Sequence, residues 1–209
     1  LTRLEPIKKT LTNPTWKELV FAAYQSNVNL CVQTMVPADS SRGYPIYAVA
    51  VTEVEVDVLT GQHIIRRVDL LEDVGISMNP EIDRGQVEGA FVMGSGYWTS
   101  EDLIYNPKNA LLVNNRTWNY KPPGAKDIPV DFRVAFRKKS PNPVGVLRSK
   151  AIGEPPLCMS YSVLLALRNA LNSARKDAGN TEPWYEFDGP ATTENILKTS
   201  LTCGDLMGL

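Results

Sequence analysis

The sequence predicts an α+β fold built from mixed helices and antiparallel strands. Three patterns support this class: helical spacing of apolar residues opens the chain, strand-like alternation over residues 45–58 is followed by an apolar stretch over 64–74, and a long apolar helical stretch begins after a pair of prolines. Hydrophobic residues make up 43% and charged residues 22% of the 209 residues. These values are ordinary for a globular protein, and the length suffices for one large domain or two small ones.

The first predicted helix covers residues 14–24. Its apolar side chains recur at helical spacing, at Trp16, Leu19, Val20 and Ala23. Thr12 or Asn13 can cap its N-terminus, and Pro14 suits the first turn, where its missing N–H has no helical partner. We expect this helix to pack on a core rather than to carry function.

A β-hairpin is predicted next. Large apolar residues recur at every second position in residues 45–58, with acidic residues between them from Glu53 to Asp57. The phase of the alternation slips by one near Thr52, which is typical of a β-bulge. A turn signal at Gly61 follows, so residues 64–74 are predicted to form the returning strand.

A glycine-rich helix is predicted to begin at Asn79. Asn79 is a cap residue, Pro80 fits the first turn, and Glu81 places an acid where the helix dipole favours it. Four glycines follow, at positions 85, 89, 94 and 96. Each interior glycine costs about 1 kcal/mol relative to alanine, and close approach of another backbone or of a ligand would offset that cost. The Gln86 amide can donate and accept hydrogen bonds, so packing and ligand binding both stay open.

The remaining elements follow the same patterns. Residues 106–149 are rich in loops, and residues 129–136 alternate like a strand. A strongly apolar helix is predicted from Leu157 to about Arg175, with so little polar surface that we expect burial on most sides. A short amphipathic helix is predicted over residues 193–200.

The charge and hydropathy patterns exclude several classes of protein. The net charge is −1 and the longest basic run is Arg137-Lys138-Lys139, so we expect no nucleic-acid partner. Apolar runs are far shorter than the roughly 18 residues that suggest a membrane span, and the N-terminus does not resemble a signal peptide. The chain begins at Leu1 rather than Met, which we interpret as a fragment or a processed chain.

Cysteine and histidine usage argues against a metal site made by this chain alone. Cys31, Cys158 and Cys203 are far apart and form no CxxC pair, so free thiols in a reducing compartment are predicted. The single histidine, His63, is interpreted as an ordinary surface residue, because one histidine rarely builds a site. We therefore predict no metal-ligating residue.

Glu154 is the candidate catalytic residue, within Gly153-Glu154-Pro155-Pro156. Two prolines can occupy the first turn of a helix but not its interior, so Glu154 is predicted to lie at a helix N-terminus. The helix dipole favours the carboxylate there, whereas a dry setting, expected from the apolar helix behind it, disfavours the charge. A carboxylate between these opposing effects suits a general base, and a helix-capping role is the alternative that the residues alone favour.

Five segments together resemble the molybdenum hydroxylase family of xanthine dehydrogenases and aldehyde oxidases. They are LLEDVG at 70–75, NPEIDRGQVEGAF at 79–91, YKPP at 120–123, DIP at 127–129 and SKAIGEPPL at 149–157. DGPAT at 188–192 continues the likeness, which covers about residues 14–200. Each motif alone is modest evidence, but five in the same order and spacing are specific.

The resemblance implies that residues 1–209 are the C-terminal portion of a molybdopterin-binding domain within a larger chain. It implies a molybdenum–molybdopterin cofactor here, with FAD and two [2Fe-2S] clusters bound outside this chain. In the family, the residues matching Gln86 and Ile152 contact the cofactor, and the residue matching Glu154 is the active-site base. The expected reaction hydroxylates an aldehyde or an N-heterocycle with water-derived oxygen, in a cytoplasmic homodimer.

Two alternatives accompany this interpretation. A xanthine dehydrogenase is the alternative to an aldehyde oxidase, and residues 97–103 and 155–160 favour the aldehyde oxidase. A non-catalytic fragment that binds a partner or dimerises is the alternative to part of an enzyme. We expect the isolated chain to hold no stoichiometric molybdenum and to oxidise no aldehyde.

Overall fold

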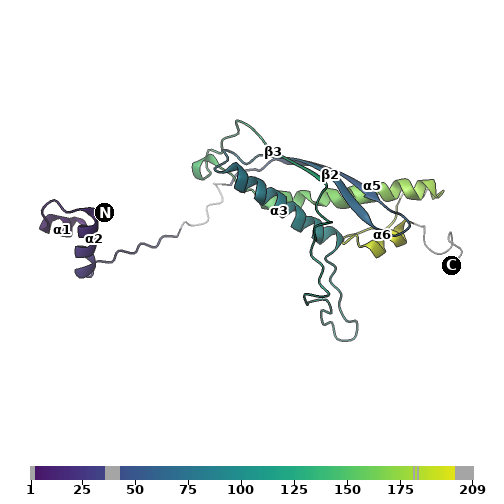
Figure 1. Ribbon diagram of the computed structural model, residues 1–209, viewed down its shortest axis with the longest axis horizontal. Coiled ribbons are helices and arrows are strands. Elements are labelled where there is room, and N and C mark those ends of the chain that lie inside the picture. Colours follow the sequence, from purple (N-terminus) through teal and green to yellow (C-terminus); the bar gives the residue numbers. More distant parts are fainter. Residues whose placement is uncertain (1–2, 36–42, 181, 183, 201–209) are drawn as a thin grey trace. The chain divides into compact units, whose positions relative to one another are not determined.

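A computed structural model describes residues 3–35, 43–180, 182 and 184–200 of the chain (Figure 1). The chain divides into two compact units, Leu1–Arg42 and Gly43–Leu209, and each is described by itself. The candidate site lies in the second unit, and Cys203 lies outside the described residues.

The first unit contains two helices, α1 (Glu5–Thr10) and α2 (Trp16–Gln25). Helix α2 confirms the predicted helix, but α1 was not predicted, and the predicted cap at Thr12 or Asn13 is wrong. The cap is Thr15, because its N–H donates to the Glu18 carboxylate at 2.8 Å while its hydroxyl accepts from the Glu18 N–H. This reciprocal pair starts the helix after Pro14 rather than at it.

The second unit contains a three-stranded sheet in the order β1 (Ala48–Val56), β2 (His63–Glu72) and β3 (Asp131–Phe136). Strands β1 and β2 form the predicted antiparallel hairpin, with a register shift between Glu53 and Val54, next to the predicted bulge. Gly61 turns the chain with a φ of +74°, a conformation that glycine adopts without strain.

Strand β3 corrects the prediction of antiparallel strands throughout, because it pairs with β2 in parallel, from Arg67 opposite Asp131 to Glu72 opposite Phe136. A parallel neighbour requires a crossover connection. Helix α3 (Pro80–Thr99) and the long loop that follows it provide that crossover, and α3 lies against the sheet as it does so (Figure 1). The fold class is therefore α+β with a mixed sheet.

Helix α3 begins as predicted. The Asn79 side chain accepts from the N–H groups of Glu81 and Ile82, and Pro80 occupies the first turn. This cap fixes the start of the helix that carries Gln86.

The apolar stretch after Gly153 forms two helices rather than one, α4 (Glu154–Met159) and α5 (Tyr161–Asp177), which meet at the buried Ser160. The expected burial on most sides is wrong for α5, whose buried residues form one face while Leu165 is 46% exposed. A 3₁₀ turn at Val146–Arg148 and helix α6 (Thr193–Thr199) complete the described elements, and α6 confirms the predicted last helix.

The core of the second unit lies between the sheet and the helices α3 and α5, which run along the same face (Figure 1). Its buried members are Ile65, Val68, Leu70, Val87, Phe91, Val163, Leu164, Leu167, Leu171, Phe187, Ala191 and Ile196. This packing holds the α3–α4 corner, where the candidate site residues lie, on a rigid support.

The four glycines of α3 serve two different purposes. A Cβ atom at Gly94 would lie 2.2 Å from the Ser160 hydroxyl oxygen and 2.7 Å from the Leu157 carbonyl oxygen, so Gly94 lets α4 approach the helix. Gly96 is covered by Pro123 in the same way. A Cβ atom at Gly85 or Gly89 meets nothing within 4 Å, so these two glycines leave an open strip on α3.

The two kinds of glycine predict opposite effects on stability. We expect Gly94→Ala to lower the free energy of unfolding by roughly 1–3 kcal/mol, because the added methyl group displaces the α4 backbone. The matched change Gly89→Ala should raise it by up to about 1 kcal/mol, because alanine is the better helix former. Urea unfolding of the chain measures both, and a loss of stability from Gly89→Ala would show that the described packing at Gly89 is wrong.

Candidate functional site

Two distant segments that carry predicted site residues meet at the N-terminal half of α3. A Cβ atom built on Gly153 would lie 3.4 Å from the Gln86 side-chain oxygen, so the Gln86 carboxamide lies beside the segment that leads into α4. Gln86 is exposed, and it lies between Gly85 and Gly89 on the open strip of α3. The structure therefore joins the glycine-rich motif and the Gly153-Glu154 motif into one candidate site.

Glu154 is the first residue of α4, as its position before two prolines predicts. The cap residue, Gly153, has no side chain, and α4 has no side-chain cap hydrogen bond. The expected dry setting is wrong for the described residues, because Glu154 is exposed there. A carboxylate in this position is available to a ligand on the surface that it shares with Gln86.

Ile152 is half-buried and packs against the hydrophobic core of the second unit. Its side chain therefore helps to hold the segment from Ala151 to Gly153 on the domain. Among the three predicted site residues, Ile152 is the one that the described fold already uses for packing.

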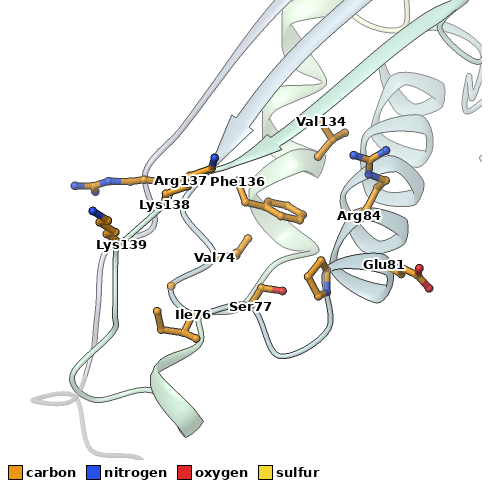
Figure 2. A pocket seen from close by; sticks show the side chains of 12 residues that line it. Val74, Ile76, Ser77, Glu81, Arg84, Val134, Phe136, Arg137, Lys138 and Lys139 are labelled. Carbon is orange, nitrogen blue, oxygen red and sulfur yellow. The ribbon is translucent and has the colours of Figure 1, made fainter.

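An open pocket of about 700 Å³ lies between the ends of β2 and β3 and the start of α3 (Figure 2). Val74, Val134 and Phe136 form its apolar side, and Arg84 reaches over it from α3. None of the three predicted site residues lines this pocket. It is therefore separate from the corner where Gln86 and Gly153 meet.

Glu72 is a buried carboxyl group that the sequence analysis did not single out. Its side chain is completely covered, and neither carboxylate oxygen has a hydrogen-bond partner among the described residues. Burial, together with the negative charges of Asp83 and Asp73, raises the pKa of Glu72 to about 7. The signal in the sequence was an acid in the inward-facing phase of β2, two residues after the buried Leu70.

Asp73 is a second buried carboxylate, and it is fully paired. It accepts hydrogen bonds from Lys150, Ser140 and Arg137, and also from the Gly75 N–H. Burial raises its pKa, but the hydrogen bonds from Lys150, Gly75 and Ser140 outweigh burial and bring the pKa below its ordinary value. The sequence analysis did not predict the ion pair between Asp73 and Lys150, although the two residues lie in segments 70–75 and 149–157, which carry the family resemblance.

The remaining candidates carry no site. His63 is half-buried rather than on the surface, and burial lowers its pKa despite the nearby negative charge of Asp127. Cys31 and Cys158 are free and exposed. Within the described residues, no three histidine, cysteine or acidic side chains are placed to hold a metal ion, and no helix is long and apolar enough to cross a membrane.

The family to which the chain belongs follows from its similarity to known proteins. Residues 3–129 match the family model of the molybdopterin cofactor-binding domain, and the chain belongs to that family. The chain is 42% identical over 207 residues to the xanthine dehydrogenase/oxidase of Gallus gallus, and 43% identical over 194 residues to the probable aldehyde oxidase 2 of Oryza sativa subsp. japonica. These alignments cover 94% and 91% of the chain, and they agree with membership of the molybdenum hydroxylase family.

The alignments cover 15% and 14% of these two relatives, so the chain spans a small part of their length. Among solved structures, the aldehyde oxidoreductase from Desulfovibrio gigas is 26% identical with a TM-score of 0.59, and the match covers 74% of this chain and 15% of that one. The CO dehydrogenase from Oligotropha carboxidovorans, 19% identical with a TM-score of 0.63 over 74% of this chain and 18% of that one, shares the fold. Both confirm the mixed architecture.

Proposed function

We propose that the chain supplies one wall of the active site of an enzyme that hydroxylates aldehydes or N-heterocycles with water-derived oxygen. The observation that carries the proposal is the meeting of Gln86 and Gly153-Glu154 beside an open strip of α3. Residues that suit cofactor binding and a residue that suits proton transfer thus share one surface.

The residues present fit a molybdopterin cofactor. Gly85 and Gly89 leave space on α3 that a side chain would fill, so a flat ligand can approach the helix backbone. The exposed Gln86 carboxamide can donate to and accept from the polar atoms of such a ligand. Ile152 would give the same ligand an apolar edge, and bound molybdenum–molybdopterin would supply the two-electron redox chemistry.

Glu154 is the proposed general base. Its carboxylate stands in the first turn of α4, where the helix dipole favours a negative charge, although Pro155 and Pro156 have no N–H to donate. An ionised carboxylate within reach of the oxygen nucleophile would take up its proton as that oxygen attacks an electron-poor carbon. The remainder of the enzyme would close the site around Glu154, exclude water and strengthen this proton transfer.

The proposed substrate, additional cofactors, location and oligomeric state are based on similarity to the relatives and not on residues of this chain. We propose a small aldehyde or N-heterocycle as substrate, FAD and two [2Fe-2S] clusters elsewhere in the enzyme, and a cytoplasmic homodimer. Xanthine dehydrogenases and aldehyde oxidases are similarly related to the chain, at 42% and 43% identity. We keep aldehyde oxidase as the favoured activity and xanthine dehydrogenase as the alternative.

Metal analysis tests the proposal against the alternative of a non-catalytic fragment that binds a partner or dimerises. We expect the full-length protein that contains this chain to purify with stoichiometric molybdenum and the absorbance of its redox centres. The 209-residue chain alone should hold no stoichiometric molybdenum and oxidise no aldehyde, because it forms only one wall of the site. A full-length protein without molybdenum would favour the fragment role, and turnover by the isolated chain would contradict the one-wall account.

A further inference from the structure

The segment that carries Ile152 and Glu154 has no regular secondary structure before α4. Ser149 makes an isolated bridge with Gly75, and residues 150–152 then run without helix or strand to the first residue of α4. Something other than a helix or a strand must therefore fix the position of this segment.

Backbone hydrogen bonds hold the beginning of the segment against the chain that leaves β2. The Lys150 N–H donates to the Val74 carbonyl at 3.0 Å, and the Ile76 N–H donates to the Arg148 carbonyl at 2.9 Å. Asn142, which is 1% exposed, donates from its amide to the Ser149 carbonyl at 2.9 Å. These contacts set the path of the chain up to Lys150 but make no bond beyond it.

The next fixed point is a buried ion pair. The Lys150 ammonium group donates to the Asp73 carboxylate at 2.9 Å, with side-chain exposures of 8% and 1%. The same oxygen of Asp73 accepts from the Ser140 hydroxyl at 2.9 Å and from Arg137 at 3.2 Å, and the other accepts from the Gly75 N–H at 3.1 Å. Arg137 also lines the pocket with Val74 and Phe136, so the hydrogen-bonded group around Asp73 adjoins that pocket (Figure 2).

A second tie reaches the segment from the chain that enters β1. Lys150 also donates to the Pro45 carbonyl at 2.8 Å, and the Ala151 N–H donates to the Tyr44 hydroxyl at 3.1 Å. Lys150 thus has its donors directed to two elements at once, the end of β2 and the entry to β1. An ammonium group has three donors, so this arrangement uses its capacity in fixed directions.

We propose that Asp73 and Lys150 are positioning residues that hold Ile152 and Glu154 in register with Gln86 on α3. The inference rests on the proposed function for its catalytic consequence. Lys150 stands two residues before Ile152 and four before Glu154, so a shift of its side chain moves the entry into α4 directly. A misplacement of about 1 Å at a reacting group can lower turnover about a hundredfold.

An ion pair suits this role because both of its side chains are buried and each is held by further hydrogen bonds. A buried pair is weak evidence for net stability, since desolvation of both charges opposes their attraction. Its directional hydrogen bonds nevertheless favour one arrangement of the segment over others. Loss of Asp73 leaves the buried Lys150 charge uncompensated, whereas loss of Lys150 leaves Asp73 with Arg137 and frees the segment from it. The expected effect is therefore local loosening of residues 149–156.

The test uses the full-length protein with Asp73→Asn, Lys150→Met and the conservative change Lys150→Arg. Asp69→Asn is the matched control, because Asp69 lies on β2, which Asp73 directly follows, and pairs with Arg67 at 2.6 Å, but both partners are about two-fifths exposed. The rate of amide hydrogen exchange over residues 149–156 is measured and compared with the rate in the core-facing part of α5. Molybdenum content, and kcat and KM with whichever of benzaldehyde and xanthine the unmodified protein oxidises faster, are measured on the same samples.

We expect Asp73→Asn and Lys150→Met to speed exchange over residues 149–156 about tenfold without changing exchange in α5. Both should lower kcat about 10- to 100-fold at unchanged KM and molybdenum content, Lys150→Arg should restore most of kcat, and Asp69→Asn should change neither exchange nor kcat. Unchanged exchange over residues 149–156, or equally faster exchange in α5, would overturn the positioning role. If Glu154→Gln stays active while Asp73→Asn still loosens the segment, the proposed base is wrong and the positioning role stands.

Discussion

Glu154→Gln in the full-length protein is expected to lower turnover by about 10² or more while leaving molybdenum content unchanged. The amide keeps the size and most hydrogen-bonding capacity of the carboxylate but cannot take up a proton at neutral pH. The loss should appear in kcat, because the proton moves only as the bond to oxygen forms. Steady-state kinetics with an aldehyde, corrected for molybdenum per protein, measure it.

Glu81→Gln provides a closely matched control for this prediction. Glu81 is also an exposed glutamate in the first turn of a helix, α3, but unlike Gln86 it has no atom within 4 Å of a Cβ built on Gly153. Its replacement should leave kcat within about twofold, because surface changes outside a site have small effects. If Glu154→Gln behaves like Glu81→Gln, the base assignment is wrong and the helix-capping alternative gains support.

Glu72→Met should stabilise the chain more strongly at pH 8 than at pH 5. The pKa of Glu72 is raised from 4.5 to about 7 in the folded state, so the folded state binds more protons than the unfolded state between these values. Stability therefore falls as the pH rises through this window, by roughly 3 kcal/mol in total. Methionine has a similar length and no charge, so it should remove both this loss and the two unpaired oxygens.

Urea unfolding of the chain at pH 5 and pH 8 measures this difference. Glu53→Met is the matched control, because Glu53 lies on the neighbouring strand β1 with an exposed side chain. Its stability should change by less than about 0.5 kcal/mol at both pH values. Equal pH dependence in Glu72→Met and the unmodified chain would show that Glu72 is not the titrating group.

Much of the fold could be predicted because local signals agree with the tertiary contacts. The Asn79 cap, the turn at Gly61 and the slip near Thr52 are local features, and each lies within a residue of its predicted place. The parallel pairing of β3 could not be predicted from alternation alone, because period-2 patterns specify a buried face but not a partner or its direction. The division at Ser160 was also hidden, since residues on either side continue a helical pattern.

The candidate site, like the fold, was predicted only in part from the sequence. Glu154 and Gln86 were found from motifs, and the contact between Gln86 and Gly153 required the structure, because it joins α3 to α4 across the chain. Asp73 and Lys150 stand in the recognised motifs, but nothing local shows that they meet. Buried charges that pair over a long sequence distance leave no periodic pattern in the sequence. The residues that hold the site in position, Asp73 and Lys150, were therefore not predicted.

The measurement that tests the account most directly is a crystal structure of the full-length protein with its molybdenum cofactor bound. The account predicts the Gln86 carboxamide at a hydrogen-bonding distance of about 3 Å from a polar atom of the cofactor, with Glu154 facing the reacting side. The cofactor should also lie along the open strip at Gly85 and Gly89. A cofactor more than about 8 Å from both Gln86 and Glu154, too far for one bridging water, would contradict the account.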